Sequence, residues 1–170
     1  PGVTVNVNGN GFESNETNID ITYDNIVVVK GINADILGTF SRSFIVPPSP
    51  SGNHAVAVTR SGRPEDSDPG AAQGFQIYSG ITLEYAEGPP GNAIQIFGSG
   101  FGANEQNISL VYDSIPVLSG LTADSIGSFQ TSFLVPPSGA GLHHIQAVSP
   151  FSVASVNPKQ EFLVIPIVGL

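Results

Sequence analysis

The sequence predicts an all-β protein built from two copies of one β-sandwich unit. Three observations predict it: apolar residues alternate with polar ones over short runs, turn-forming residues separate these runs, and the whole pattern occurs twice. The chain contains 20 Gly and 14 Pro among its 170 residues, a composition that suits tight turns. No stretch shows the 3.6-residue period of an amphipathic helix. We therefore expect strands and turns throughout.

The repeat is visible at a constant spacing. Residues 1–60 align without a gap with residues 90–149, and twenty-six of these sixty pairs are identical. Identity at this level indicates two copies of one folding unit. We expect a first sandwich at residues 1–79, a second at residues 80–164, and a separate C-terminal segment at residues 165–170.

Alternating apolar residues place the strands of the first copy at residues 3–7, 19–23, 40–46 and 54–58. Turn residues separate these runs at Gly9-Asn-Gly11, Asp24-Asn25, Asp35-Ile-Leu-Gly38 and Pro47-Pro48. One residue breaks the pattern, because Arg42 falls on the apolar parity of its run. We expect a β-bulge or a position at the sandwich rim there.

A series of short motifs recurs in both copies: a Gly-x-Gly-Phe turn, a Tyr-Asp hairpin, an Asp-x-x-Gly-x-Phe turn, a Val-Pro-Pro step and a Gly-x-His strand start. Gly88-Pro-Pro-Gly91 opens the second copy in the same way that Pro1-Gly2 opens the first. In this order the motifs resemble the IPT/TIG-type immunoglobulin-like repeats of bacterial and archaeal surface proteins. The resemblance covers nearly the whole chain. It implies two tandem immunoglobulin-like sandwiches, and it leaves the function open because this architecture serves many.

The repeat alignment predicts that the strand missing from the start of the first sandwich has its counterpart at the C-terminus. Residues 162–170 align without a gap with residues 75–83, of which Ile81-Thr-Leu83 is expected to form the first strand of the second sandwich. Pro1 matches Pro90, a position after that strand. We therefore expect the first sandwich to lack its own first strand and the C-terminus to carry a spare one.

The missing strand is supplied and the spare strand is paired if the tail of one molecule completes the first sandwich of the next. Such head-to-tail contacts generate filaments, so the expected partners are identical subunits. The predicted interface joins Ile165, Ile167, Val168 and Leu170 of the donor to the groove beside Val5 and Val7 of the acceptor. Two other arrangements stay open: a longer array of repeats that supplies the strand in cis, and a tail that folds back along its own second sandwich.

Charge and composition bear on partners and location. The formal net charge of −9 disfavours binding to nucleic acid. The apolar C-terminal run of nine residues is too short for a membrane-spanning helix, so no membrane insertion is expected. The sequence has neither cysteine nor methionine. We expect an exported, extracellular or cell-surface protein, and either a leader has been removed or the sequence is a piece of a longer chain.

Candidate catalytic and metal-binding residues are few. His54 and His143 are repeat equivalents expected at a sandwich rim, and His144 has no equivalent. The repeated aspartates are expected to bond local backbone N–H groups in turns; they are Asp24 and Asp113, and Asp35 and Asp124. The acidic cluster Glu65-Asp-Ser-Asp68 is expected to form a solvated loop, and a calcium site there is the alternative. We expect no enzyme, no metal and no cofactor.

Two Asn-x-Ser/Thr triplets, at Asn15 and Asn107, are candidate N-glycosylation sites. Asn15 is expected on a surface loop and Asn107 at the start of a strand. Glycans there would help a surface of low charge to stay in solution.

The sequence therefore predicts a structural subunit of an extracellular filament. The alternatives are a fragment of a multi-repeat cell-surface adhesin, a carbohydrate-binding module, and an accessory domain attached to an enzyme.

Overall fold

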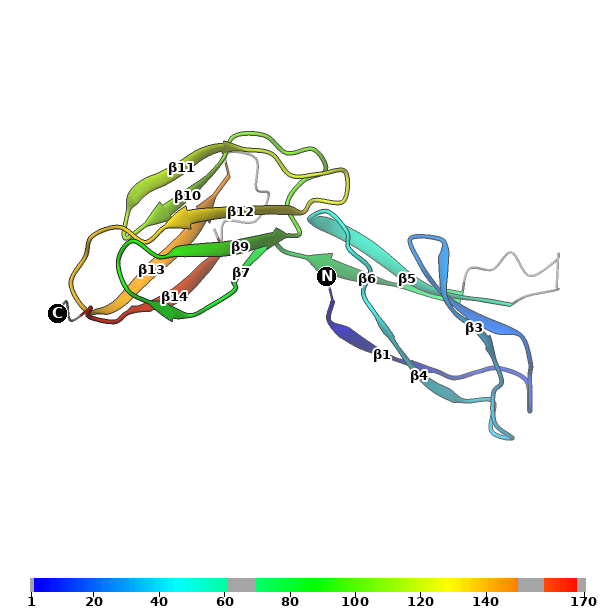
Figure 1. The fold of residues 1–170 in the computed structure, drawn as a ribbon. Coiled ribbons are helices and arrows are strands. Elements are labelled where there is room, and N and C mark those ends of the chain that lie inside the picture. The colour runs from blue at the N-terminus through cyan, green and yellow to red at the C-terminus, as the bar shows by residue number, and fades with distance from the viewer. Residues whose placement is uncertain (1, 61–69, 150–157, 168–170) are drawn as a thin grey trace. The chain divides into compact units, whose positions relative to one another are not determined.

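The structure is a computed structural model that describes residues 2–60, 70–149 and 158–167, apart from the side chains of residues 70 and 71. The described residues form fourteen strands (Figure 1), and among them no helix is long and apolar enough to cross a membrane. The chain divides into two compact units. The first comprises residues 1–47 and 53–76, and the second comprises residues 48–52 and 77–170.

The first unit contains six strands in two sheets. They are β1 (Thr4–Gly9), β2 (Ile19–Tyr23), β3 (Ile26–Ile32), β4 (Phe40–Ile45), β5 (Gly52–Arg60) and β6 (Gly70–Ile77). One sheet consists of β1 and β4, and the other has the order β3-β2-β5-β6. The two sheets meet through aromatic side chains, since the ring centroids of Tyr23 and Phe44 are 6.2 Å apart.

The second unit contains eight strands, also in two sheets. They are β7 (Gly80–Leu83), β8 (Glu87–Gly88), β9 (Ala93–Ser99), β10 (Ile108–Tyr112), β11 (Ile115–Leu121), β12 (Phe129–Leu134), β13 (Gly141–Val148) and β14 (Lys159–Val164). The sheet orders are β12-β9-β7 and β11-β10-β13-β14-β8. With β7 and β8 as the split first strand, this is the strand order of an immunoglobulin-like sandwich. The protein is therefore all-β, with the immunoglobulin-like strand order that the motifs led us to expect.

The same tight hairpin occurs in each unit. Asp24 and Asn25, which join β2 to β3, have φ angles of 48° and 66°. Asp113 and Ser114, which join β10 to β11, have φ angles of 46° and 75°. Two consecutive residues with positive φ define the type I′ turn that matches the twist of a two-residue hairpin, and Asp and Asn tolerate this conformation.

The core of the second unit lies between its two sheets. Ile94 and Ile96 of β9 are fully buried against Ile145 of β13 and Phe162 of β14. Ile81 of β7 belongs to the same core and is 2% exposed. Alternate residues of each strand therefore point inward, as the period of two predicts.

Of the two alternatives expected at Arg42, the exposed position holds: Arg42 lies in unbroken register opposite Val7 and is exposed, without a bulge in the β1–β4 pairing. One detail differs from expectation. In β2 the polar residues are buried together with the apolar ones, because both have hydrogen-bond partners. Asp20 accepts a 2.8 Å bond from the Gly31 amide, and the Thr22 hydroxyl donates to the Ala57 carbonyl at 3.3 Å.

Candidate functional site

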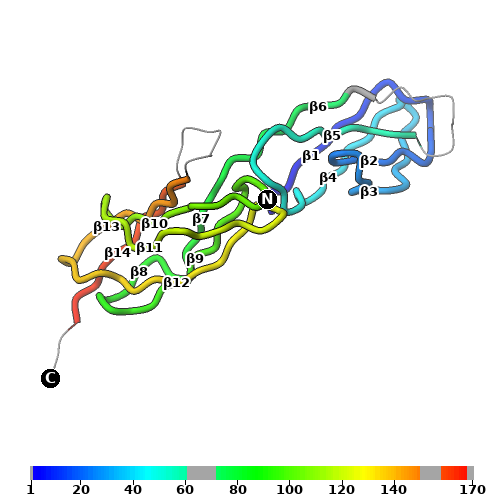
Figure 2. The backbone as a smooth tube through the Cα atoms, turned by 90° about the horizontal axis from the view of Figure 1, so that it is seen from above, coloured from blue at the N-terminus to red at the C-terminus, as the bar shows by residue number. Residues whose placement is uncertain are grey.

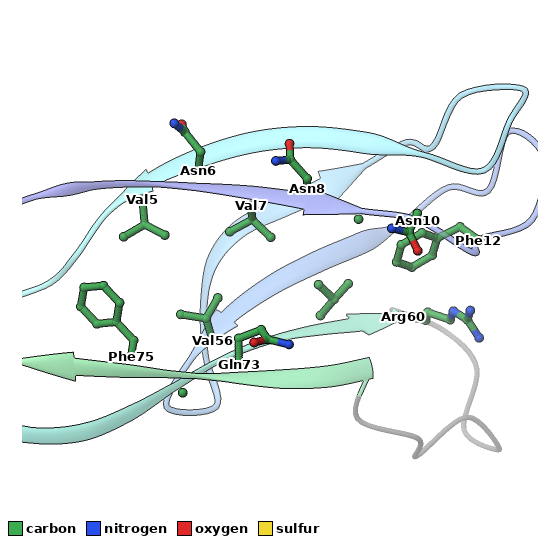
Figure 3. A pocket seen from close by; sticks show the side chains of 13 residues that line it. Val5, Asn6, Val7, Asn8, Asn10, Phe12, Val56, Arg60, Gln73 and Phe75 are labelled. Carbon is green, nitrogen blue, oxygen red and sulfur yellow. The ribbon is translucent and has the colours of Figure 1, made fainter.

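A groove opens along β1 in the first unit. Val5 and Val7 point from β1 into this groove, whereas Asn6 and Asn8 point away from it (Figure 3). The groove has a volume of about 490 Å³. Its other apolar side chains come from the loop after β1 and from β5 and β6; they are Phe12, Val56, Val58 and Phe75. The two predicted acceptor residues therefore lie in one apolar groove.

The equivalent residues of the second unit are buried. Val5 and Val7 are half-buried, whereas their equivalents Ile94 and Ile96 are 1% and 0% exposed. Phe12, Val58 and Phe75 are half-buried as well, and their equivalents Phe101, Ala147 and Phe162 have exposures of 0 or 1%. The same residue pattern therefore forms a closed core in one unit and an open groove in the other.

The difference lies in what runs beside the equivalent strands. In the second unit β9 has two neighbours, because β12 pairs with one edge and β7 with the other. Within the part of the first unit that the structure describes, β1 pairs with β4 and with no other strand. Ile81 of β7 enters the second core opposite Gly98, which is the equivalent of Gly9. The groove thus occupies the position that β7 fills in the second unit.

A glycine marks the path by which the chain enters β7. A Cβ at Gly100 would lie 2.4 Å from the Tyr78 carbonyl oxygen, so the backbone leading into β7 passes directly over this glycine. Gly11 is the repeat equivalent and has the same left-handed backbone, with φ values of 82° and 68° at Gly11 and Gly100. A Cβ at Gly11 would meet no atom of the described residues within 4 Å. The passage that Tyr78 fills in the second unit is therefore open in the first.

The C-terminal segment leaves β14 beside β8. Ile165 donates its backbone N–H to the Gly88 carbonyl oxygen at 3.2 Å, and it is the last residue of the segment for which the structure shows a bond to β8. Ile165 is 37% exposed and Ile167 is 66% exposed. Val168 and Leu170, the other two predicted donor residues, lie outside the described residues. The described part of the tail therefore exposes apolar side chains.

The repeated histidines pair with the repeated aspartates, a relationship that the sequence interpretation missed. His54 Nδ1 lies 2.6 Å from Asp24 Oδ2, and His143 Nδ1 makes the equivalent contact with Asp113 Oδ2. The other oxygen of Asp24 accepts the Ala55 amide at 2.9 Å. Each aspartate thus links its hairpin turn to the start of the neighbouring strand. The prediction had assigned it only to bonds within its own turn.

His143 has a second acceptor. Its Nε2 donates to the Gly139 carbonyl oxygen at 2.8 Å. Because a carboxylate and a carbonyl only accept, these two contacts favour the cationic form of the imidazole, in which both ring nitrogens carry a proton. The bond to Asp113, followed by the bond to Gly139, raises the pKa of His143. Partial burial acts to raise the pKa of Asp113, but the bonds from His143 and from the His144 amide outweigh it and lower this pKa.

The other candidate residues behave as follows. Asp35 accepts bonds from the amides of Leu37 and Thr39, and Asp124 does the same within its own turn, as predicted. Over the described stretches of the chain, no group of three or more His, Cys, Asp or Glu residues is placed to hold a metal ion. The acidic cluster at residues 65–68 lies outside these stretches.

The two glycosylation candidates are exposed, and their backbone conformation gives a reason for asparagine there. Asn15 and Asn107 have φ angles of 57° and 62°, and their repeat equivalents Asn104 and Asn18 have 55° and 62°. Asparagine is one of the few residues that adopt this left-handed conformation readily. Asn15 lies in a loop, and Asn107 directly precedes β10.

Some of the groove could not be found from the sequence. Val5 and Val7 were identifiable because the repeat alignment pairs them with residues beside a strand. Phe12 and Phe75 also have repeat equivalents, so the repeat alignment was the signal that could have identified them as groove residues. The position of Gly11 as an open passage depends on the backbone of the second unit and needed the structure.

Comparisons with known proteins add likenesses of shape. No protein-family model matches the chain, and no curated protein matches it. The D0-D1 domain of intimin is 12% identical with a TM-score of 0.37, over 95% of this chain and 91% of that one. The adhesin InvE of Yersinia pseudotuberculosis is 13% identical with a TM-score of 0.36, over 96% of this chain and 54% of that one. At these TM-scores the likenesses carry no argument about function, and membership of the IPT/TIG family stays a prediction.

Proposed function

We propose that the protein is the subunit of an extracellular filament, in which the C-terminal strand of one molecule fills the groove of the next. The observation that supports this most is the open groove along β1, at the place where β7 closes the second unit. The tail supplies the matching segment, because residues 162–170 align with residues 75–83. The donated segment in this proposal is thus the repeat equivalent of β7.

The pairing of β7 with β9 gives the expected register of the donated strand. Ile81 lies opposite Gly98 and Leu83 opposite Ile96. Transferred to the groove, Val168 lies opposite Gly9 and Leu170 opposite Val7. Val168 and Leu170 then enter the groove, as the buried Ile81 and half-buried Leu83 enter the second core.

The same transfer assigns the remaining donor residues. Ile165 takes the place of Tyr78 and passes over Gly11, as Tyr78 passes over Gly100. Ile167 takes the place of Gly80, on the outward parity of the strand. Burial of a valine and a leucine side chain contributes about 1.5–3 kcal/mol each, to which the backbone bonds along the β1 edge add register. Val168 and Leu170 are therefore the anchors, and Ile165 and Ile167 lie along the approach.

One groove and one tail per molecule make the contact head-to-tail, which extends without closing. The acidic net charge and the absence of cysteine suit an exported subunit, so we place the filament outside the cell or at its surface. N-glycans at Asn15 and Asn107 belong to this proposal as modifications of its surface.

A mixing experiment with two full-length variants tests the proposal. Val168→Asp with Leu170→Asp blocks the tail and keeps the groove, because a buried carboxylate without a partner is strongly unfavourable. Val7→Asp blocks the groove and keeps the tail, and Val7 is only half-buried in the subunit, beside the open groove. Negative-stain electron microscopy and analytical ultracentrifugation report filaments, dimers and monomers.

The intact chain is expected to form filaments, and each variant alone to stay monomeric. An equimolar mixture is expected to give a one-to-one dimer and no filament, because one good tail meets one good groove. Filaments formed by either blocked variant would contradict the proposal. A monomeric intact chain, or a mixture without dimers, would contradict it as well.

A further inference from the structure

A short loop covers the end of the second unit at which Phe101 lies. Residues 48–52 belong to the second unit, although in the chain they lie between β4 and β5. The Ser51 amide donates to the Phe101 carbonyl oxygen at 3.0 Å. A Cβ at Gly127 would lie 3.0 Å from the Cα of Pro50. The loop of residues 48–52 therefore lies against both Phe101 and the turn that contains Gly127.

The equivalent end of the first unit has no such cover in the part that the structure describes. Phe12 and Gly38 are the repeat equivalents of Phe101 and Gly127. The three atoms nearest to a Cβ at Gly38 all belong to the Phe12 backbone, so no other segment comes as close as Pro50 does to Gly127. Phe12 is half-buried, whereas Phe101 is 1% exposed. Among the described residues, no backbone amide donates to the Phe12 carbonyl oxygen.

The turn beside Gly38 is also more exposed than its counterpart. Leu37, the residue before Gly38, is 81% exposed. Its equivalent Ile126, the residue before Gly127, is 42% exposed. The end of the first unit thus presents an exposed apolar side chain and a backbone carbonyl at the place where the loop of residues 48–52 lies on the second unit.

The second unit carries a copy of this loop next to its tail. Residues 137–141 are equivalent to residues 48–52. Gly139 and Ala140 are exposed, and Gly141 begins β13. β13 and β14 lie side by side (Figure 2), with Gly141 opposite Val164, the residue before Ile165. The loop and the start of the tail therefore lie next to each other at one end of the same sheet.

Two segments cover the second unit at this end, namely the chain leading into β7, over Gly100, and the loop of residues 48–52, over Phe101. In the proposed filament the donated tail takes the place of the first segment. Resting on that proposed function, we infer that the loop of residues 137–141 takes the place of the second, on the first unit of the next molecule.

The equivalences give the contacts of this second part of the interface. The Ala140 amide donates to the Phe12 carbonyl oxygen of the acceptor, as Ser51 donates to Phe101. Gly139 lies against Gly38, as Pro50 lies against Gly127. The tail alone supplies the groove contact, whereas a folded donor unit supplies both contacts.

Cysteine trapping tests this contact, because the chain contains no cysteine of its own. The probe is the full-length Glu13→Cys, Ala140→Cys variant, in which both substituted positions are exposed. Glu13 directly follows Phe12, so the proposed bond brings its Cα within about 7 Å of the Ala140 Cα, which a disulfide can span. Filaments of this variant are oxidised and then separated by non-reducing gel electrophoresis.

The controls are the two single-cysteine variants and the Ile45→Cys, Ala140→Cys pair. Ile45 is 67% exposed and pairs with Thr4, at the other end of β1 from Phe12. The probe is expected to give a ladder of covalent multimers that a reducing agent collapses, and the controls to give no ladder. Filaments of the probe without a ladder would overturn the loop contact and leave the proposed function standing. An intact chain that forms no filaments would overturn the proposed function and the loop contact with it.

Donor affinity provides a second test. The Val7→Asp protein is the donor and the Val168→Asp, Leu170→Asp protein is the acceptor, so that only a one-to-one dimer forms. Ala140→Glu in the donor is expected to weaken this dimer by about fivefold or more in sedimentation, because its carboxylate meets the Phe12 carbonyl oxygen and the nearby Glu13.

Ala140→Ser in the donor is the matched control, since it restores the residue that makes the bond in the second unit. Ala140 is exposed, so both variants are expected to fold as the parent does. The serine variant is expected to bind as tightly as the parent donor. Equal affinities of the glutamate and serine variants would contradict a loop contact, while dimers formed by both would still support the donated strand.

Discussion

Val7 and Ile96 occupy the same position in the two repeats, yet Ile96 is completely buried and Val7 lies half-buried in an open groove. The two strands pair with equivalent neighbours in the same register: Val7 of β1 lies opposite Arg42 of β4, and Ile96 of β9 lies opposite Thr131 of β12. The strand on the other edge makes the difference. β7 covers Ile96, and in the described part of the first unit no strand covers Val7.

This difference predicts unequal costs for the same kind of truncation. Ile96→Ala leaves a cavity in a closed core and is expected to lower the free energy of unfolding of the second unit by about 2–5 kcal/mol. Val7→Ala removes methyl groups that already border the open groove and leaves no closed cavity. We therefore expect it to lower the free energy of unfolding of the isolated subunit by about 1 kcal/mol or less. Urea unfolding of the tail-blocked variant, which is the full-length protein with Val168→Asp and Leu170→Asp, measures both losses with and without each substitution. Equal losses at the two positions would mean that Val7 is covered in solution.

Removal of residues 165–170 is expected to abolish filament formation and to leave the second unit folded. Ile165 makes one backbone bond to Gly88, and none of the described tail residues, 165–167, belongs to the core of the second unit. Electron microscopy of the truncated chain checks the first expectation, and its thermal unfolding checks the second. Filaments of the truncated chain would rule out the tail as donor.

A copy of residues 78–89 placed ahead of Pro1 is expected to close the groove in cis. In the second unit this segment directly precedes Pro90, the equivalent of Pro1, and it contains both β7 and β8. The extended protein is expected to be monomeric, and its first unit more stable than that of the tail-blocked variant. Sedimentation and thermal unfolding report the two properties. The same extension with Ile81→Asp is the matched control and should leave the groove open.

The His143–Asp113 pair is expected to make the stability of the second unit depend on pH. The pKa of His143 is raised in the folded protein, so its contribution is full below the unfolded value of 6.5 and is lost as the pH rises through the higher folded value. The pKa of Asp113 is lowered, so its contribution is full above the unfolded value of 3.8 and is lost as the pH falls through the lower folded value. The pair therefore stabilises most between about pH 4 and 6.5.

Thermal unfolding of the tail-blocked variant from pH 5 to pH 9, with His143→Gln as control, measures this dependence. The unfolding midpoint of the His143 protein is expected to fall relative to the control as the pH rises through the folded pKa. NMR titration of the imidazole gives that pKa directly. A His143 pKa at or below 6.5 would contradict the cationic pair.

Asn15 is expected to carry a glycan when the protein is produced in a host that glycosylates Asn-x-Ser/Thr triplets. Asn15 and Thr17 are both exposed, which leaves the triplet accessible. Asn15→Gln should then lower the apparent mass by one glycan, as seen by mass spectrometry. Asn104→Gln is the matched control, because Asn104 has the same left-handed backbone without a triplet. An unmodified Asn15 in such a host would refute the assignment.

The strands were predictable because apolar and polar residues alternate locally. The repeat was predictable because identical residues recur at one fixed spacing. The positions of Val5 and Val7 in a groove followed from the same alignment. The pairing of His54 with Asp24 was not predictable in this way. These residues are 30 positions apart, and the contact depends on the pairing of β2 with β5, which brings the hairpin turn next to the start of β5. The regular register at Arg42 likewise depends on the exposed rim of β4, where a long side chain reaches the Ser41 carbonyl without distorting the strand.

The stacking of each buried tyrosine on its neighbouring histidine gives the molecule two optical labels. The protein has four tyrosines and no tryptophan. Tyr23 and Tyr112 are each 3% exposed and stack on His54 and His143, at 5.2 and 5.1 Å between ring centroids. Tyr78 and Tyr85 are largely exposed and contribute little to near-ultraviolet circular dichroism. The tyrosine signal in the near-ultraviolet spectrum thus comes mainly from one buried ring in each unit, and in a Tyr112→Phe protein circular dichroism of this signal would follow the ordering of the first unit as its groove is filled.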